Sequence, residues 1–152
     1  MDITNNIPNS CKVVVIGGGV AGCSTAYHLA KFGWKDTVLL ERDVLTSGTT
    51  WHAAGLIGQL GSSATITRLR NYSLNLYKQL EEETGLSTGL KQNGSLTVAT
   101  TSDRLEELKR QVTFAQRFEI EAKVVNKEEI KHIYPLINTD DIVGGIFITR
   151  DG

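Results

Sequence analysis

The fold of this chain is decided by residues 12–22, which read KVVVIGGGVAG. The run over residues 12–16, apolar and β-branched after Lys12, is typical of a strand buried on both faces in a parallel sheet. The glycines end that strand, and residues 20–32 favour a helix that Gly33 closes in a positive-φ position. A second apolar strand follows over residues 37–40. Together these segments predict a strand–helix–strand βαβ unit.

The glycine spacing within this unit predicts a phosphate-binding turn. Gly17 allows the tight turn, Gly19 lets a pyrophosphate approach the backbone, and Gly22 lets helix and strand pack closely. The helix N-terminus then offers unpaired N–H groups and partial positive charge to the phosphates. Glu41 ends the second strand, where its carboxylate can accept hydrogen bonds from ribose hydroxyls but disfavours a 2′-phosphate. The pattern therefore predicts a dinucleotide, FAD or NAD rather than NADP.

Length and charge narrow the class of protein further. The chain has 152 residues and a net charge of −1, with 16 Lys and Arg against 17 Asp and Glu. No basic stripe is available for nucleic acid, and the apolar runs are shorter than the roughly 18–20 residues of a membrane helix. Cys11 and Cys23 form no metal or disulfide pattern, which favours a reducing compartment and predicts no metal site. Residues 1–11 have no signal-peptide or transit-peptide character.

The remaining sequence predicts a second region of mixed helices and strands. Residues 42–62 are glycine-rich and are expected to be irregular. The expected elements after them are a helix from Ser63 closed by Gly85, a strand over 94–100, a helix capped by Ser102 or Asp103, a strand over 123–125, a helix with an Asn126–Glu129 capping box that ends before Pro135, and a strand over 143–149.

Residues 46–56, TSGTTWHAAGL, favour FAD over NAD. A simple NAD enzyme would continue with regular βα units, whereas this loop of small and hydroxyl-bearing residues lets a cofactor lie along backbone amides. Trp51 and His52 are its bulky side chains. The imidazole of His52 could serve as a hydrogen-bond donor, a base or a nucleophile.

The chain resembles the N-terminal part of the dimethylglycine and sarcosine dehydrogenases, within the D-amino-acid-oxidase-like flavoproteins. The resemblance extends over most of the chain from Val13 and rests on the stretches VVVIGGGVAG, AYHLAKFGWKDTVLLER, LTSGTTWHAAGL, LYKQLEEETG, QNGSLTVAT and YPLIN..D.VGG. It implies that FAD is attached covalently to His52. It also places FAD against the residues Val20, Ala21, Glu41, Arg42, Gly48, Thr49, Thr50, Trp51, His52, Ala53, Ala54, Gly55 and Leu56.

The covalent role of His52 also has a physical basis. Attachment to the flavin needs a neutral imidazole nitrogen beside the 8α carbon, with the other ring nitrogen hydrogen-bonded so that the tautomer is fixed. The link makes the flavin a better electron acceptor and prevents its loss. The alternative is that His52 only donates a hydrogen bond to the cofactor.

The resemblance implies a reaction and an incomplete architecture. Family members oxidise an N-methyl amine such as dimethylglycine or sarcosine: a hydride passes to flavin N5, and the iminium is hydrolysed to formaldehyde or handed to tetrahydrofolate before an electron acceptor reoxidises the flavin. They are several times longer than this chain. We therefore interpret it as a fragment of an α/β, three-layer flavoprotein: a tail over 1–11, a Rossmann-like FAD-binding part over 12–89, and the start of an α+β substrate domain over 90–152. The catalytic residues are expected beyond Gly152, so the fragment alone should be inactive.

Two other functions fit parts of the pattern. The regulatory subunit of pyruvate dehydrogenase phosphatase is a non-catalytic relative with the same fold, but its subfamily lacks the Trp-His pair that Trp51 and His52 form here. The second alternative is an NAD-dependent dehydrogenase, which would explain the βαβ unit, but residues 42–62 give this alternative no support. The expected location is the cytoplasm for a bacterial-type protein and the mitochondrial matrix for a eukaryotic homologue.

Overall fold

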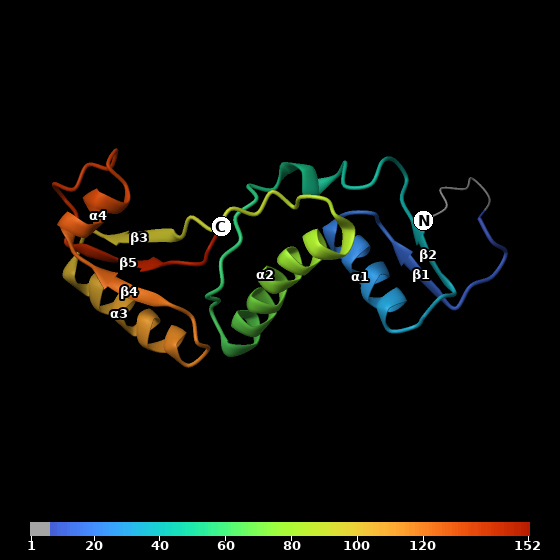
Figure 1. The fold of residues 1–152 in the computed structure, drawn as a ribbon, viewed down its shortest axis with the longest axis horizontal. Coiled ribbons are helices and arrows are strands. Elements are labelled where there is room, and N and C mark those ends of the chain that lie inside the picture. The colour runs from blue at the N-terminus through green and yellow to red at the C-terminus, as the bar shows by residue number, and fades with distance from the viewer. Residues whose placement is uncertain (1–6) are drawn as a thin grey trace. The chain divides into compact units, whose positions relative to one another are not determined.

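The computed structural model describes residues 7–152, and the chain divides into two compact units. The first unit ends at Gly55 and the second comprises Leu56–Gly152. Figure 1 shows β1, α1 and β2 of the first unit in blue to cyan and the elements of the second in green to red. The unit boundary lies earlier than the predicted domain boundary at 89/90, because residues 57–61 hydrogen-bond and pack within the second unit. The division into cofactor and substrate domains stays a prediction, and residues 1–6 of the expected tail lie outside the described residues.

The first unit is the predicted βαβ unit. Strands β1 (Val13–Ile16) and β2 (Thr37–Leu40) pair in parallel, with Val13 opposite Thr37, and α1 (Val20–Lys31) connects them. Gly33 follows the helix with a φ of 87°, the left-handed conformation that glycine adopts without strain. The elements and their order confirm the prediction from residues 12–41.

Burial of β1 on both faces was the wrong expectation. Val15 points to the side that α1 covers and is 9% exposed, whereas Val14 and Ile16 on the other side are 50% and 85% exposed. Successive side chains of a strand point to opposite faces, so one helix can bury only one of them. The opposite apolar face of β1 is open within the described residues.

The segment after β2 is more regular than the sequence predicted. Residues Thr49–His52 form a 3-10 turn, η1, inside the stretch expected to be irregular. The Trp51 N–H donates to the Gly48 carbonyl at 3.2 Å, and the Ala53 N–H donates to the Thr50 carbonyl at 3.2 Å. A single such turn leaves no apolar periodicity in the sequence, which is why it was missed.

Helix α2 (Ala64–Thr84) begins and ends where its sequence signals predict. The Ser63 hydroxyl accepts a hydrogen bond from the Ile66 N–H at 3.3 Å, as an N-cap does. Gly85 ends the helix in the left-handed conformation, with a φ of 67°.

Three antiparallel strands form the sheet of the second unit. They are β3 (Ser95–Ala99), β4 (Ala122–Val125) and β5 (Gly144–Ile148), in the order β3-β5-β4. The predicted strands agree with these to within one residue at each end. Within residues 7–152, β5 is thus the central strand, and β3 and β4 each pair with it and not with each other.

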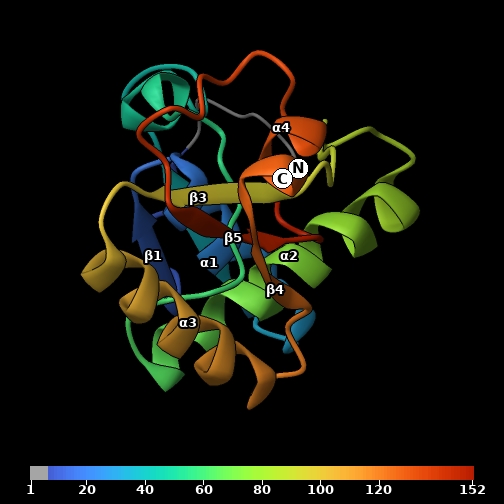
Figure 2. The ribbon, with the colours of Figure 1, turned by 90° about the vertical axis from the view of Figure 1, so that its left-hand side faces the viewer.

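Two helices cover the opposite faces of this sheet. Figures 1 and 2 show α3 (Ser102–Gln116) on one side and α4 (Lys127–Ile133) on the other. The α3 side buries Ala99, Leu108, Val112, Ala115, Ile120, Ile146 and Ile148, and the α4 side buries Val125, Ile130 and Ile142. The second unit therefore has a hydrophobic core on both faces of its sheet.

The N-cap predicted from the sequence is confirmed for α4 but not for α3. The Asn126–Glu129 capping box of α4 is present, with both hydrogen bonds formed at 2.9 Å. For α3 the predicted cap, Ser102 or Asp103, was wrong: the side chain of Thr101 accepts from the Arg104 N–H at 3.3 Å. Thr101 has the extended backbone of an N-cap, whereas Ser102 already lies in the helix.

A buried carboxylate fastens the start of the second unit to its end. Asp151 is 6% exposed and accepts hydrogen bonds from the Gln59 N–H at 2.8 Å, the Gln59 side-chain amide at 3.2 Å and the Ser95 hydroxyl at 2.6 Å. Beside it, Ile57 and Gly152 exchange two backbone hydrogen bonds. These donors satisfy a charge that would otherwise be costly to bury.

Candidate functional site

The glycine turn between β1 and α1 requires glycine for a different reason at each position. Gly17 has a φ of 101°, which side chains other than glycine rarely adopt. A Cβ on Gly22 would lie 1.8 Å from the Gly17 carbonyl oxygen, so helix and turn could not pack as they do. A Cβ on Gly19 would lie 3.0 Å from the Thr50 hydroxyl. The sequence predicted the turn and the close packing at Gly22.

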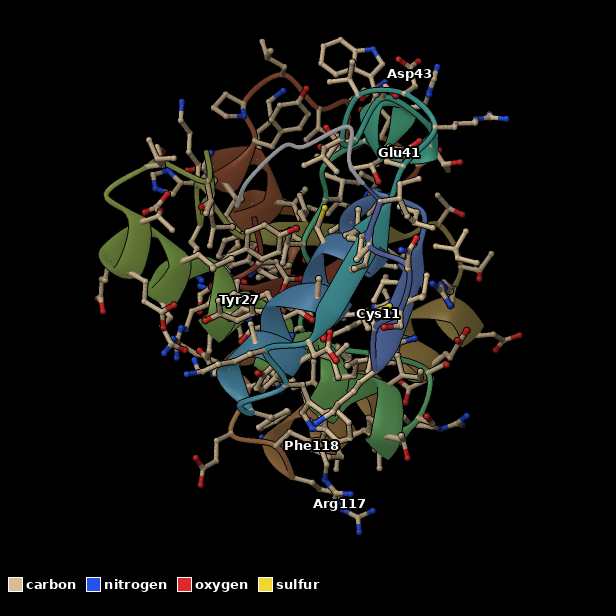
Figure 3. The ribbon with its side chains drawn as sticks, turned by 90° about the vertical axis from the view of Figure 1, so that its right-hand side faces the viewer. Cys11, Tyr27, Glu41, Asp43, Arg117 and Phe118 are labelled. Atoms are coloured by element: carbon tan, nitrogen blue, oxygen red, sulfur yellow. The ribbon has the colours of Figure 1, made fainter. Side chains whose placement is uncertain are left out.

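The carboxylate of Glu41 lies against this turn. Its Oε2 accepts a hydrogen bond from the Gly18 N–H at 2.6 Å, and its Oε1 accepts from the Arg42 N–H at 2.7 Å and the Asp43 N–H at 3.1 Å. Figure 3 shows Glu41 at the end of β2 with Asp43 close by. The predicted approach of Glu41 to the glycine turn is thus what the structure has.

These hydrogen bonds keep Glu41 ionised. The Gly18 N–H, followed by the Asp43 N–H, holds the pKa of the Glu41 carboxyl below its ordinary value of 4.5, against a weaker opposing effect of burial. The Arg42 amide and guanidinium lower the pKa further. The edge of the turn therefore carries a fixed negative charge at neutral pH, which repels a 2′-phosphate and keeps about one lone-pair site for a hydroxyl donor.

Two threonines join the following loop to the glycine turn. The Thr46 N–H donates to the Gly18 carbonyl at 2.9 Å, and Thr46 adopts the left-handed conformation with a φ of 68°. The Thr50 hydroxyl accepts a hydrogen bond from the Val20 N–H at 2.9 Å. A threonine at positive φ is uncommon and costs energy, so the surrounding contacts must hold it there.

The turn, the start of α1 and the loop line an open cavity of about 560 Å³ within the first unit. Its lining combines backbone amides, a carboxylate and small hydroxyl side chains. The lining residues are Gly19, Val20, Ala21, Glu41, Arg42, Asp43, Ser47, Gly48, Thr49, Thr50 and Ala53.

Most of the residues expected to contact a cofactor lie on this cavity, and some do not. Gly17 and Gly22 determine the shape of the turn but do not line the cavity. Trp51 and Leu56 are 79% and 85% exposed, and Leu56 belongs to the second unit. The residues of the expected set outside the lining are Gly17, Gly22, Trp51, His52, Ala54, Gly55 and Leu56.

His52 lies at the end of η1 with a defined tautomer. Its Nδ1 is 3.0 Å from the Gly48 carbonyl oxygen. A carbonyl oxygen only accepts, so Nδ1 carries the hydrogen and, in the neutral ring, Nε2 keeps its lone pair. The ring is exposed. In the neutral ring this hydrogen bond makes Nε2 the nitrogen that can act as a nucleophile.

Three residues of the site were missed by the sequence analysis. Asp43 and Ser47 line the cavity, and Gly18 donates its N–H to Glu41. A Cβ on Gly18 would also lie 2.5 Å from Leu45 and 3.0 Å from the Cβ of Glu41. The unbroken Gly17-Gly18-Gly19 run was the available signal for Gly18, and Ser47 lies in the hydroxyl-bearing stretch 46–56 without having been named as a contact, whereas nothing in the local sequence marks Asp43.

Neither a membrane-spanning helix nor a metal cluster occurs within residues 7–152. None of the helices there is both long and apolar enough to cross a bilayer. No group of three or more His, Cys, Asp and Glu side chains in that range could hold a metal ion.

Residues 12–152 match the family of FAD dependent oxidoreductases designated DAO. This chain belongs to that family. The match includes the glycine turn, Glu41 and the loop that carries His52, and it continues through the second unit. The cofactor of the family is FAD, so the NAD-dependent alternative is set aside.

The chain is similar to several characterised members and relatives. It is 47% identical to human mitochondrial sarcosine dehydrogenase over 147 residues, 96% of this chain and 16% of that protein. It is 43% identical to rat mitochondrial dimethylglycine dehydrogenase over 93% of this chain and 16% of that protein. It is also 39% identical to the mouse regulatory subunit of pyruvate dehydrogenase phosphatase, over 95% of this chain and 16% of that protein. The chain thus spans about 16% of the length of these relatives.

A solved structure supports the architecture. L-proline dehydrogenase from P. horikoshii matches with a TM-score of 0.88 and 29% identity, over 96% of this chain and 38% of that one. The Rossmann-like βαβ unit and the strands and helices after it are therefore those of an FAD-dependent oxidoreductase.

Proposed function

We propose that the cavity of the first unit binds the dinucleotide part of FAD and that the protein oxidises an N-methyl amine such as sarcosine or dimethylglycine. The observation that carries the proposal is the convergence of the glycine turn, the first amides of α1, Glu41 and the His52 loop around one cavity of about 560 Å³. The identities of 47% and 43% to the two dehydrogenases support the substrate class.

The residues present fit FAD. Gly19 leaves the approach to the N-terminus of α1 free of a side chain, where backbone N–H groups and the helix dipole favour a pyrophosphate. Glu41 accepts hydrogen bonds from three amides, which leaves about one of its four lone-pair sites to accept a hydroxyl of the adenosine ribose. Thr49 and Thr50 offer hydroxyl donors on the same wall.

His52 is proposed as the covalent attachment point of the flavin. FAD, when bound, supplies the hydride acceptor of the reaction. The chain's own contribution is the orientation of the imidazole: the Gly48 carbonyl accepts a hydrogen bond from the Nδ1–H, which leaves the lone pair of Nε2 to form the bond. An attached ring cannot dissociate and is held in one orientation, which benefits a reaction that depends on alignment.

The non-catalytic alternative is also a relative, at 39% identity. The residues that favour the enzyme are Trp51 and His52, because the regulatory subfamily is expected to lack them. This proposal also includes the substrate, an electron acceptor for the flavin, and tetrahydrofolate in the full-length protein as the acceptor of the one-carbon group. It further includes a location in the cytoplasm or the mitochondrial matrix.

The proposal is tested by a chimera in which residues 12–152 replace the matching segment of human sarcosine dehydrogenase. We expect the purified chimera to keep a yellow flavin on the polypeptide after denaturation and to oxidise sarcosine with an artificial acceptor. His52→Ala should release the flavin on denaturation, while the matched control His132→Ala, an exposed histidine of α4, should retain it.

Other outcomes would refute separate parts of the proposal. Flavin that leaves the unaltered chimera on denaturation would show that His52 is only a contact. Flavin that stays on His52→Ala would place the attachment elsewhere. The 152-residue chain alone should bind FAD but show no amine oxidation, and turnover by it would refute the expectation that catalytic residues lie outside it.

A further inference from the structure

Helix α1 begins without a cap of its own. Its N-cap residue is Gly19, which has no side chain to accept a hydrogen bond from the first amides of the helix. The Val20 N–H, which has no partner inside the helix, donates instead to the Thr50 hydroxyl at 2.9 Å. The cap of α1 thus comes from a residue thirty positions later in the chain.

The approach of Thr50 depends on Gly19. A Cβ at position 19 would lie 3.0 Å from the Thr50 oxygen, which is tighter than nearly all contacts of real Cβ atoms. The glycine therefore admits the threonine hydroxyl as well as leaving room for a ligand. Thr50 and Gly19 both line the cavity.

Thr50 and His52 belong to the same short turn. The turn η1 is closed by the hydrogen bonds from Trp51 to Gly48 and from Ala53 to Thr50. The His52 ring is fastened to the Gly48 carbonyl at 3.0 Å. A shift of Thr50 would therefore move the turn that orients the imidazole.

The Thr50 oxygen accepts the Val20 N–H, so its own hydrogen is available for another acceptor. A phosphate oxygen at the N-terminus of α1 is such an acceptor, because the helix dipole draws an anion to that position. One hydroxyl can then contact the helix amide and the anion together.

We propose that Thr50 is a positioning residue that couples dinucleotide binding at the glycine turn to the ordering of the His52 turn. This coupling rests on the proposed function, since it takes the dinucleotide phosphates as the ligand. Thr50 transmits the occupancy of the phosphate site to η1 through its hydroxyl, and His52 is ordered as a consequence.

The test compares Thr50→Val, which keeps the shape and loses the hydroxyl, with Thr50→Ser, which keeps the hydroxyl. Amide hydrogen exchange of Val20 and of residues 49–53 is measured by NMR on the 152-residue chain, with and without saturating FAD. The matched control is Thr25→Val, an exposed threonine of α1 whose hydroxyl bonds only within the helix, to the Ala21 carbonyl.

In the wild type, FAD should slow exchange both at Val20 and over residues 49–53. In Thr50→Val the Val20 amide should exchange about five- to tenfold faster without FAD, as expected for a lost cap. FAD should bind this variant more weakly, because one hydroxyl contact to the phosphate is lost, and at saturation it should no longer slow exchange over 49–53. Thr50→Ser and Thr25→Val should behave as the wild type.

Several results would overturn the coupling. One is FAD-dependent slowing over 49–53 that persists in Thr50→Val. Another is complete loss of FAD binding in Thr50→Val with normal binding in Thr50→Ser, since Thr50 would then act through affinity alone and not through the order of η1. Failure of the Ser variant to restore the slowing would show that the hydroxyl is not responsible. A wild-type chain that takes up no FAD would refute the proposed function, and the coupling with it.

Discussion

The sheet of the first unit and the sheet of the second have strands of similar length but are stabilised differently. In the first, Val15 is the one buried hydrophobic side chain among the described residues, and the outer face of β1 is exposed. In the second, Ile146 and Ile148 of the central strand are buried at 2% and 6% exposure, with helices over both faces.

The first unit depends instead on close backbone contacts and on hydrogen bonds to side chains. Glu41 binds three amides, Thr50 caps α1, and Gly22 packs against a carbonyl. Such contacts define a geometry without burying much apolar surface, which is the main source of folding stability. The first unit, which carries the site, thus has a well-defined geometry but a small hydrophobic core. We therefore expect ligand binding to raise its free energy of unfolding strongly.

The largest expected effect is a loss of stability in the second unit without a change in FAD affinity. Leu108 is fully buried between α3 and the sheet, so Leu108→Ala should lower the free energy of unfolding of the second unit by about 2–5 kcal/mol. FAD affinity of the first unit should not change. Both tryptophans, Trp34 and Trp51, lie in the first unit, so urea unfolding followed by tryptophan fluorescence and by circular dichroism will distinguish the two units. A matching loss in both signals would contradict their independence.

The reverse effect is expected at the glycine turn. Gly22→Ala brings a Cβ to 1.8 Å from the Gly17 carbonyl, so α1 must move away from β1. Overpacking of about 1–3 kcal/mol corresponds to roughly a 5- to 150-fold loss of FAD affinity, measured by flavin fluorescence titration. The control is Gly58→Ala in the second unit, where a Cβ would meet nothing closer than 3.6 Å. Equal affinities for the two variants would show that the close packing at Gly22 does not matter.

A smaller effect tests the corrected cap of α3. Thr101→Ala should destabilise the second unit by about 1 kcal/mol, because the Arg104 N–H loses its acceptor. Ser102→Ala should have little effect, since Ser102 lies in the first turn of the helix. Chemical denaturation followed by circular dichroism compares the two, and a larger loss for Ser102→Ala would favour the cap that the sequence predicted.

The smallest effect is the protonation of Glu41, which should change the glycine turn only at acidic pH. The pKa of Glu41 is held below 4.5 in the folded chain, so its contribution to the order of the glycine turn is fully present above that value. It should be lost as the pH falls from about 4.5 through the lower, folded-state pKa. A carboxyl-carbon NMR titration of Glu41 measures the shift directly. The Gly18 amide should respond over the same pH range, and in Glu41→Gln that response should disappear.

The elements that the sequence predicted are those whose signals are local. The βαβ unit, the Ser63 and Gly85 limits of α2 and the capping box at Asn126 each depend on residues a few positions apart. The cap of α3 was displaced by one residue because Thr101 and Ser102 are both good caps, and only the backbone conformation distinguishes them.

The features that escaped prediction involve residues distant in the sequence. The Val20–Thr50 hydrogen bond joins two residues thirty positions apart, and the contact of Gly18 with Glu41 spans twenty-three. The exposure of Val14 and Ile16 escaped because an apolar strand does not show what covers it. Glu41 was predicted because strand ends in a βαβ unit meet at one edge, a rule that works over a long separation.

The position of β5 at the centre of its sheet has a consequence for how the protein is made. Among the described residues, strands β3 and β4 do not pair with each other, and each pairs with β5, which follows both in the sequence. During synthesis at about 5–20 residues per second, the edges of β3 and β4 therefore stay unpaired until β5 has left the ribosome. The strands of the first unit are complete long before that moment. A nascent chain should thus acquire its glycine turn early, and a ribosome that pauses before β5 would leave two unpaired strand edges open to chaperones or to neighbouring chains.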